Sequence, residues 1–171
     1  MNAIIIGEGS ERDPRSIPLS TRDRTYIPNY RMPEHPPEVR REAAKMFKQD
    51  HAAAKLRSSS SSYNCVGHVF AARRTWVESD HLSMILERDG YSPFQDIQKL
   101  WEGDVVVYEN EQGEPTHVAQ VTEIRLNLNI GGRTVFVLSK WGAYGEYLHE
   151  LLDVPVRLGK PKAFWTERRE V

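Results

Sequence analysis

Residues 62–70 read Ser-Tyr-Asn-Cys-Val-Gly-His-Val-Phe and contain the only cysteine of the 171-residue chain. The stretch ends a run of five serines, 58–62, and leads into a segment whose apolar residues recur at helical spacing. We therefore expect a helix to begin near Cys65, with Ser62 or Asn64 as its cap. Free backbone N–H groups and the helix dipole at that position favour a thiolate. The thiol is then either a nucleophile or a buried small hydrophobe, and the stretch alone leaves both open.

A histidine in a β-rich segment is the partner that we expect for this thiol. Residues 116–121 read Thr-His-Val-Ala-Gln-Val and follow turn-forming residues at 110–115. A catalytic thiol needs an imidazole to hold its proton and return it to the leaving group, and such a base commonly comes from a separate element. His117 fits that role. His68, one helical turn after Cys65, is the competitor, and it could instead be a core histidine or the wall of a pocket.

The rest of the sequence predicts an α+β domain. Helices are expected from Pro36 to about Leu56, with Val39, Ala43, Met46 and Phe47 buried, and again over 79–90. Three β-rich runs follow, at 105–108, 116–124 and 134–138, and they predict an antiparallel meander. The proline-rich residues 1–35 are expected to form an irregular arm, and residues 36–171 the domain. Phe164 and Trp165 are expected to pack back on the sheet.

The third strand adds a candidate for orienting the imidazole. Residues 137–142 read Val-Leu-Ser-Lys-Trp-Gly. Ser139 leaves an apolar strand beside the histidine strand, where it could hydrogen-bond to His117 as the third member of a triad does. Trp141 would shield that hydrogen bond from water. The alternative is a strand end followed by a core tryptophan.

Composition and charge exclude several other classes of function. The net charge is −1, so no basic field points to nucleic acid or to an anionic membrane surface. Residues 3–6 are too short an apolar run for a signal peptide, so we expect a protein that is cytoplasmic as synthesised. No metal is expected, because Cys65 and His68 lack further ligands at suitable spacing, and no cofactor is expected either.

Three blocks, in order, resemble the NlpC/P60 and CHAP cysteine peptidases, whose fold is papain-like. The first is Tyr-Asn-Cys-Val-Gly at 63–67, and the second joins Gly-Asp-Val-Val-Val-Tyr at 103–108 to Thr-His-Val-Ala at 116–119. The third, Ser-Lys-Trp-Gly at 139–142, is similar to the Asn-Ser-Trp-Gly block of papain. The resemblance spans roughly residues 58–145.

The resemblance implies roles for particular residues. Cys65 would be the nucleophile, His117 the general base and acid, and Ser139 the orienting residue, although the families use His, Asn, Gln or Glu there. Tyr63 and the backbone N–H of Cys65 would help to hold the oxyanion. The residues expected at the substrate are Tyr63, Asn64, His68 and Trp141.

The implied reaction is hydrolysis of amide bonds in peptides or peptidoglycan peptides through an acyl-enzyme. Related proteins include bacterial toxins, so an immunity protein is a conceivable partner, with export by a route that needs no cleaved signal. Two other functions stay open. One is a catalytically silent binding module that uses the region of Trp141 and Tyr144, and the other is an acyltransferase or thioesterase acting on lipid or thioester substrates.

Overall fold

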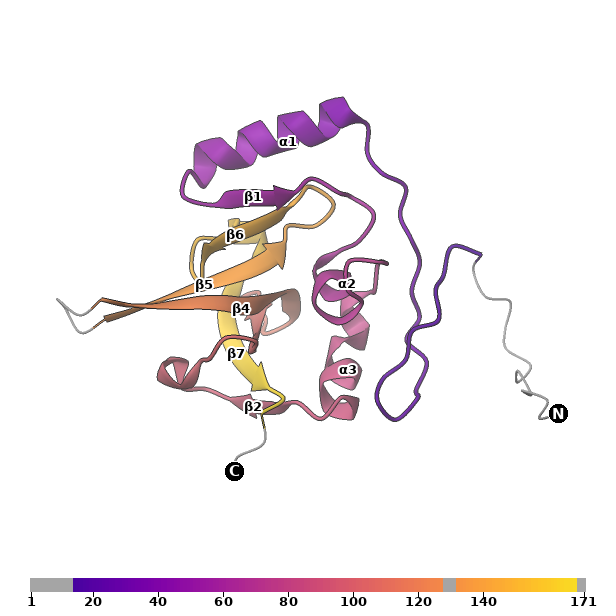
Figure 1. Cartoon of the computed structure of the whole chain (residues 1–171), viewed down its shortest axis with the longest axis vertical. Coiled ribbons are helices and arrows are strands. Elements are labelled where there is room, and N and C mark those ends of the chain that lie inside the picture. Colours follow the sequence, from indigo (N-terminus) through magenta and orange to yellow (C-terminus); the bar gives the residue numbers. More distant parts are fainter. Residues whose placement is uncertain (1–13, 128–131, 169–171) are drawn as a thin grey trace.

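A single antiparallel sheet of seven strands organises the protein, in the order β1-β6-β5-β4-β3-β7-β2 (Figure 1). The computed structural model describes residues 14–127 and 132–168. The strands are β1 Lys55–Ser58, β2 Ser92–Phe94, β3 Val105–Glu109, β4 Pro115–Asn127, β5 Gly132–Lys140, β6 Glu146–Glu150 and β7 Lys160–Thr166. The α+β class is therefore confirmed.

The helices are few and short. They are α1 Pro37–Asp50, α2 Cys65–Phe70 and α3 Leu82–Arg88, with 3₁₀ turns at Ser79–His81, Ile97–Lys99 and Val156–Leu158. Helices α2 and α3 cover one face of the sheet, and α1 lies beyond the β1 edge (Figure 1). No helix among the described residues is both long and apolar enough to cross a bilayer.

The two faces of the sheet bury separate apolar clusters. Val105, Val107 and Val118 pack with Cys65 and Val66 on the helical face. The cluster on the other face contains the alternate residues of the same strands. Its members include Val106, Tyr108, Ala119, Val121 and Leu151. Side chains alternate between faces along a strand, so β3 and β4, which are apolar at successive positions, are buried on both sides.

The first predicted helix is shorter than expected. It ends at Asp50, and Lys55–Ser58 form strand β1. Ala43 and Phe47 are buried as predicted, but Val39 and Met46 are 42% and 47% exposed. The helix lies at the edge of the sheet, so it buries a narrower stripe than the sequence pattern suggested. Gly90 ends α3 with a φ of 77°, as its predicted position after the helix requires.

The N-terminal arm has little regular structure, as predicted, yet it is part of the core. Its described residues form only isolated bridges, from Ser20 to Tyr26 and from Tyr30 to Trp76. Ile27 is 1% exposed and belongs to the same cluster as Cys65. The side chain of Asn29 accepts from the backbone N–H of Ile17 at 3.0 Å and from the Thr75 hydroxyl at 2.9 Å. The arm runs along the outer side of α2 and α3 (Figure 1).

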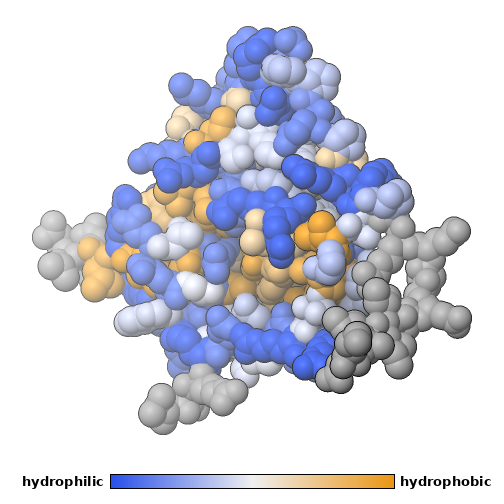
Figure 2. Space-filling model, turned by 45° about the vertical axis from the view of Figure 1, so that its right-hand side comes forward, coloured by the Kyte–Doolittle hydropathy of each residue, from blue (hydrophilic) through white to orange (hydrophobic). Residues whose placement is uncertain are grey.

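The surface mixes polar and apolar side chains. In Figure 2, hydrophilic residues cover most of the visible face, and apolar residues gather in patches between them. Exposed apolar side chains include Trp101, Leu126, Leu152 and Val156.

Truncating Ile27 to alanine should destabilise the protein by about 2–4 kcal/mol, because a fully buried aliphatic side chain loses its packing and leaves a cavity. Urea unfolding followed by circular dichroism measures the change. Leu152→Ala is the matched control: this leucine is 76% exposed, so its loss should change the free energy of unfolding by less than about 0.5 kcal/mol. Equal stability of Ile27→Ala and the wild type would show that the arm is dispensable.

Candidate active site

Helix α2 begins at Cys65, and Asn64 is its cap, as one of the two predicted alternatives. The Asn64 side-chain oxygen accepts from the backbone N–H of Gly67 at 2.9 Å and from that of Val77 at 3.2 Å. Its amide donates to the Val77 carbonyl at 2.6 Å. Asn64 therefore ties the helix start to the segment that follows the helix, which fixes the position of the thiol.

The helix ends after six residues, at Phe70. Ala72 and Arg73 have φ values of 49° and 64°, so the chain turns sharply after Phe70. The turn brings the returning segment against the helix: a Cβ on Gly67 would lie 1.8 Å from the Thr75 carbonyl oxygen. Only glycine permits this approach.

The Cys65 thiol is buried, with 9% of the residue exposed. Burial raises its pKa, whereas the backbone N–H groups of Val118, Val66 and Cys65 itself, together with the Lys140 charge, act in the opposite direction. The sulfur therefore lies among donors suited to a thiolate, while its burial favours the thiol.

Lys140 is the charged group on the thiol's side of the sheet, and the sequence reasoning missed it. The residue is fully buried, and its Nζ donates to the Gly142 carbonyl at 2.6 Å and lies 5.2 Å from the Tyr63 ring centroid. Burial lowers its pKa to about 8, against the opposing effects of Cys65, Glu34 and Glu146. The sequence shows only a lysine at the end of an apolar run, which does not reveal that the side chain is buried.

A second buried charge, Glu146, joins α2 to the sheet. Its carboxylate accepts from the Tyr63 hydroxyl at 2.9 Å and from Arg73 Nε at 2.7 Å. His68 Nε2 lies 3.4 Å from the same carboxylate. Burial nevertheless lowers the pKa of His68 to about 4, so this imidazole is neutral at pH 7 and the contact is not an ion pair. The left-handed turn at Arg73 is what presents its guanidinium to Glu146.

His117 lies on the opposite face of the sheet from Cys65. It is paired with Tyr108 across β3 and β4, and their ring centroids are 5.3 Å apart. Tyr108 and Ala119 belong to the cluster on that opposite face, whereas Val118 packs with Cys65. Neither ring nitrogen of His117 has a hydrogen-bond partner within the described part of the chain. The predicted hydrogen bond between Cys65 and His117 is therefore not formed, because alternation along β4 turns the imidazole away.

Ser139 orients a different histidine. Trp141 Nε1 donates to Ser139 Oγ at 3.1 Å, and Ser139 Oγ is 2.8 Å from His149 Nε2. His149 Nδ1 is 2.8 Å from the Glu150 carbonyl oxygen, so Nδ1 carries the proton and Nε2 accepts from Ser139. Each group in this chain is satisfied, which gives Ser139, Trp141 and His149 a structural role on the His117 face.

None of the residues predicted to bind substrate is open to solvent. Tyr63 and His68 are 3% and 5% exposed and surround Glu146, while Asn64 is committed to the cap. Trp141 is fully buried and stacks on Tyr147, with ring centroids 4.1 Å apart. Of the two residues predicted as a contact surface, Trp141 is therefore buried and Tyr144 is partly exposed.

A large surface cleft lies away from all of these residues. Its volume is about 1250 Å³, and its walls include Phe94, Trp101, Leu126, Arg133 and Arg168. Across the described ranges, no group of three or more His, Cys, Asp and Glu side chains is arranged to hold a metal ion.

The buried histidines should make the protein sensitive to acid. Burial lowers the pKa of His117 to about 3 and those of His68 and His149 to about 4, from 6.5. The unfolded chain takes up these protons first, so stability is full above pH 6.5 and is lost as pH falls below it. Each imidazole should remove about 2 kcal/mol between pH 6.5 and pH 5.

Urea unfolding across this pH range measures how the free energy of unfolding changes with pH. His117→Phe keeps an aromatic ring and removes one titrating group and its two unpaired nitrogens. We expect it to reduce the loss between pH 6.5 and pH 5 by about 2 kcal/mol. The same loss of unfolding free energy in His117→Phe and the wild type would mean that His117 is protonated in the folded protein.

Comparison with known proteins identifies a family but no relative of established function. No curated protein and no solved structure matches the chain. One family model matches residues 54–162, a range that contains Cys65, His117, Ser139 and Lys140 and excludes the arm and α1. The chain belongs to this family, which is described as a domain of unknown function, DUF7689.

Proposed function

We propose that the protein is a cysteine hydrolase in which Cys65 is the nucleophile and Lys140 its proton acceptor. One observation carries the proposal: a fully buried lysine, whose pKa is lowered to about 8, lies 5.2 Å from the ring of Tyr63, two residues before the only thiol of the chain, and its charge acts on that thiol. Burial of an ammonium group is unfavourable, and such perturbed groups concentrate at functional sites.

The groups around the sulfur suit acyl transfer. The neutral amine of Lys140 would take the thiol proton, and the resulting thiolate would attack the carbonyl carbon of the substrate. The Lys140 ammonium would return the proton to the leaving amine as the C–N bond breaks. Water would then hydrolyse the thioester, releasing the acid and restoring the thiol. In this mechanism Lys140 takes the role first predicted for His117.

The substrate class comes from the resemblance of the Cys65 block to the NlpC/P60 and CHAP peptidases. Amide bonds of peptides, including peptidoglycan peptides, are therefore the proposed targets. The papain-like fold is part of the same proposal, supported by a cysteine at a helix start packed on an antiparallel sheet.

A silent binding module is the second candidate. The burial of Cys65 and the turning of His117 to the other face support it. In that case the cleft at Trp101 and Leu126 is the available ligand surface.

Cleavage of a mixed peptide and peptidoglycan-peptide library, followed by mass spectrometry, tests the proposal. Cys65→Ala should abolish cleavage, and Lys140→Met should lower kcat/KM by about 10²–10⁴-fold, because it keeps the stem and removes the base. His117→Phe, the control on the opposite face, should change kcat/KM by less than about tenfold. Loss of activity in His117→Phe with activity retained in Lys140→Met would overturn the assignment of Lys140.

The pH profile gives an independent check. Only the neutral amine accepts a proton, so kcat/KM should rise with pH and level off above about pH 8, the pKa of Lys140. Lys140→Met should lose this rise. Absence of cleavage by the wild type at every pH, with no acyl adduct on Cys65 by intact mass, would favour the silent module.

A further inference from the structure

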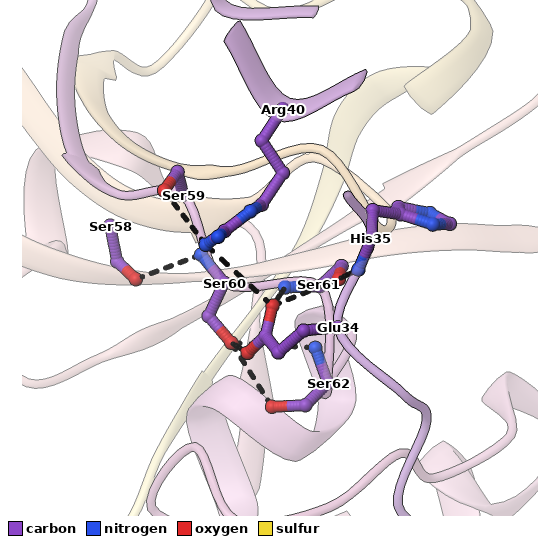
Figure 3. Close-up of polar contacts among 8 residues, drawn as sticks. All are labelled: Glu34, His35, Arg40, Ser58, Ser59, Ser60, Ser61 and Ser62. Carbon is purple, nitrogen blue, oxygen red and sulfur yellow. Dashed lines mark hydrogen bonds and ion pairs between the residues drawn. The ribbon is translucent and has the colours of Figure 1, made fainter. Parts of the chain in front are cut away.

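The serine loop before Cys65 holds a carboxylate in a defined pocket. Glu34, from the arm, is bound by the Ser61 backbone N–H at 2.7 Å and the Ser61 hydroxyl at 3.0 Å, and by the Ser60 hydroxyl (Figure 3). Arg40 of α1 completes the wall, with its Nη1 3.9 Å from Glu34 Oε2 and 3.4 Å from the Ser59 hydroxyl. We call Arg40, Ser59, Ser60 and Ser61 the carboxylate pocket.

The pocket is built from more than the contact with Glu34. The Ser61 hydroxyl also accepts from the His35 backbone N–H at 2.5 Å, and the Ser60 N–H donates to Ser58 Oγ at 3.2 Å. Burial would raise the pKa of Glu34, but the hydrogen bonds from Ser60 and Ser61 and the Arg40 charge lower it to about 2. The loop therefore selects an ionised carboxylate.

Glu34 leaves hydrogen-bond donors of Arg40 unused. Arg40 Nε is buried and has no hydrogen-bond partner among the described residues. At 3.9 Å the guanidinium makes only a loose ion pair with Glu34, although a guanidinium can bind a carboxylate through two parallel hydrogen bonds. A carboxylate that is free of the arm could satisfy the Arg40 donors better than Glu34 does.

The pocket is coupled to the thiol. The Met32 backbone N–H donates to the Ser62 carbonyl at 3.3 Å, so the arm lies against the loop three residues before Cys65. The charge of Glu34 also acts on Lys140, which in turn acts on Cys65. Farther back the arm is held by Ile27 in the core and by the bridge from Tyr30 to Trp76.

We propose that the carboxylate pocket is a binding site for a carboxylate group of the substrate, and that Glu34 occupies it and latches residues 31–36 against the loop that leads to Cys65. An acidic side chain or a terminal carboxylate of a peptide would replace Glu34, and the release of residues 31–36 would loosen the loop that leads to the thiol. The choice of a peptide as ligand rests on the proposed hydrolase function; the pocket and its latch do not. Glu34 and Arg40 lie outside the matched range 54–162, so the pocket joins the arm and α1 to the family domain.

The rate of Cys65 alkylation by iodoacetamide in the full chain tests the latch. Alkylation of a covered thiol follows the population of the open state. Glu34→Ala should therefore raise the rate about tenfold, the loss of roughly one charged hydrogen-bonded group. Glu38→Ala removes a glutamate that pairs with Arg41 at 3.0 Å on the exposed surface of α1, and it should leave the rate unchanged. Equal rates for Glu34→Ala and the wild type would overturn the latch.

Competition by a free carboxylate tests the specificity of the pocket. Propionate should displace Glu34 from the pocket of the wild type and raise the alkylation rate, whereas propionamide, of similar size and without charge, should not. Arg40→Met should lose this response to propionate. Equal acceleration by both compounds, or none by either, would refute a carboxylate site. Near-ultraviolet circular dichroism confirms that each variant is folded, and Glu34→Gln, which is isosteric, should also alkylate faster if the charge forms the latch.

The two proposals can fail separately. Faster alkylation of Glu34→Ala and of the wild type in propionate, but no cleavage of any peptide by either protein, would support the pocket and refute the hydrolase. Peptide cleavage by the wild type with no effect of Glu34→Ala on alkylation would support the hydrolase and refute the pocket.

Discussion

The burial of strand β4 on both faces is the constraint on which the candidate site depends. Val118 packs under α2 with Cys65, and its neighbours His117 and Ala119 must then face the other cluster. A shift of one residue would exchange the two sets and bury the wrong side chains on each face. The sheet therefore separates the buried polar groups into two sets: Lys140 and Glu146 with the thiol, and the imidazoles of His117 and His149 behind it.

The sequence predicts the elements better than their relative orientation. The helix start at Cys65, its Asn64 cap and the three central strands follow from local signals, namely a capping residue before an apolar run and β-rich runs between turns. A motif that places a cysteine before a helix and a histidine on a strand does not specify which face of the sheet the histidine takes. That depends on register and on what packs behind the strand, and both are set by residues distant in sequence.

Other features could not be predicted from the sequence either, because they also depend on residues distant in sequence. Strands β1, β6 and β7 are short or interrupted by charged residues, and they form because neighbouring strands offer free backbone groups. Lys140 directly follows Ser139, and the sequence alone gives it no role. Its burial follows from its position between Tyr63 and the Gly142 carbonyl, contacts that no spacing rule contains.

The position of Lys140 links the arm to the chemistry of the thiol. Water reaching Cys65 would lower the pKa of the thiol, because burial is the largest cause of its elevation. Removal of Glu34 would take away a negative charge that raises the pKa of Lys140, while hydration would raise that pKa, so these two effects on the amine oppose each other. Opening the arm should therefore change the nucleophile more than the base. The backbone N–H groups of Val118 and Val66 already lower the pKa of the thiol, so this activation needs no rearrangement of the sheet.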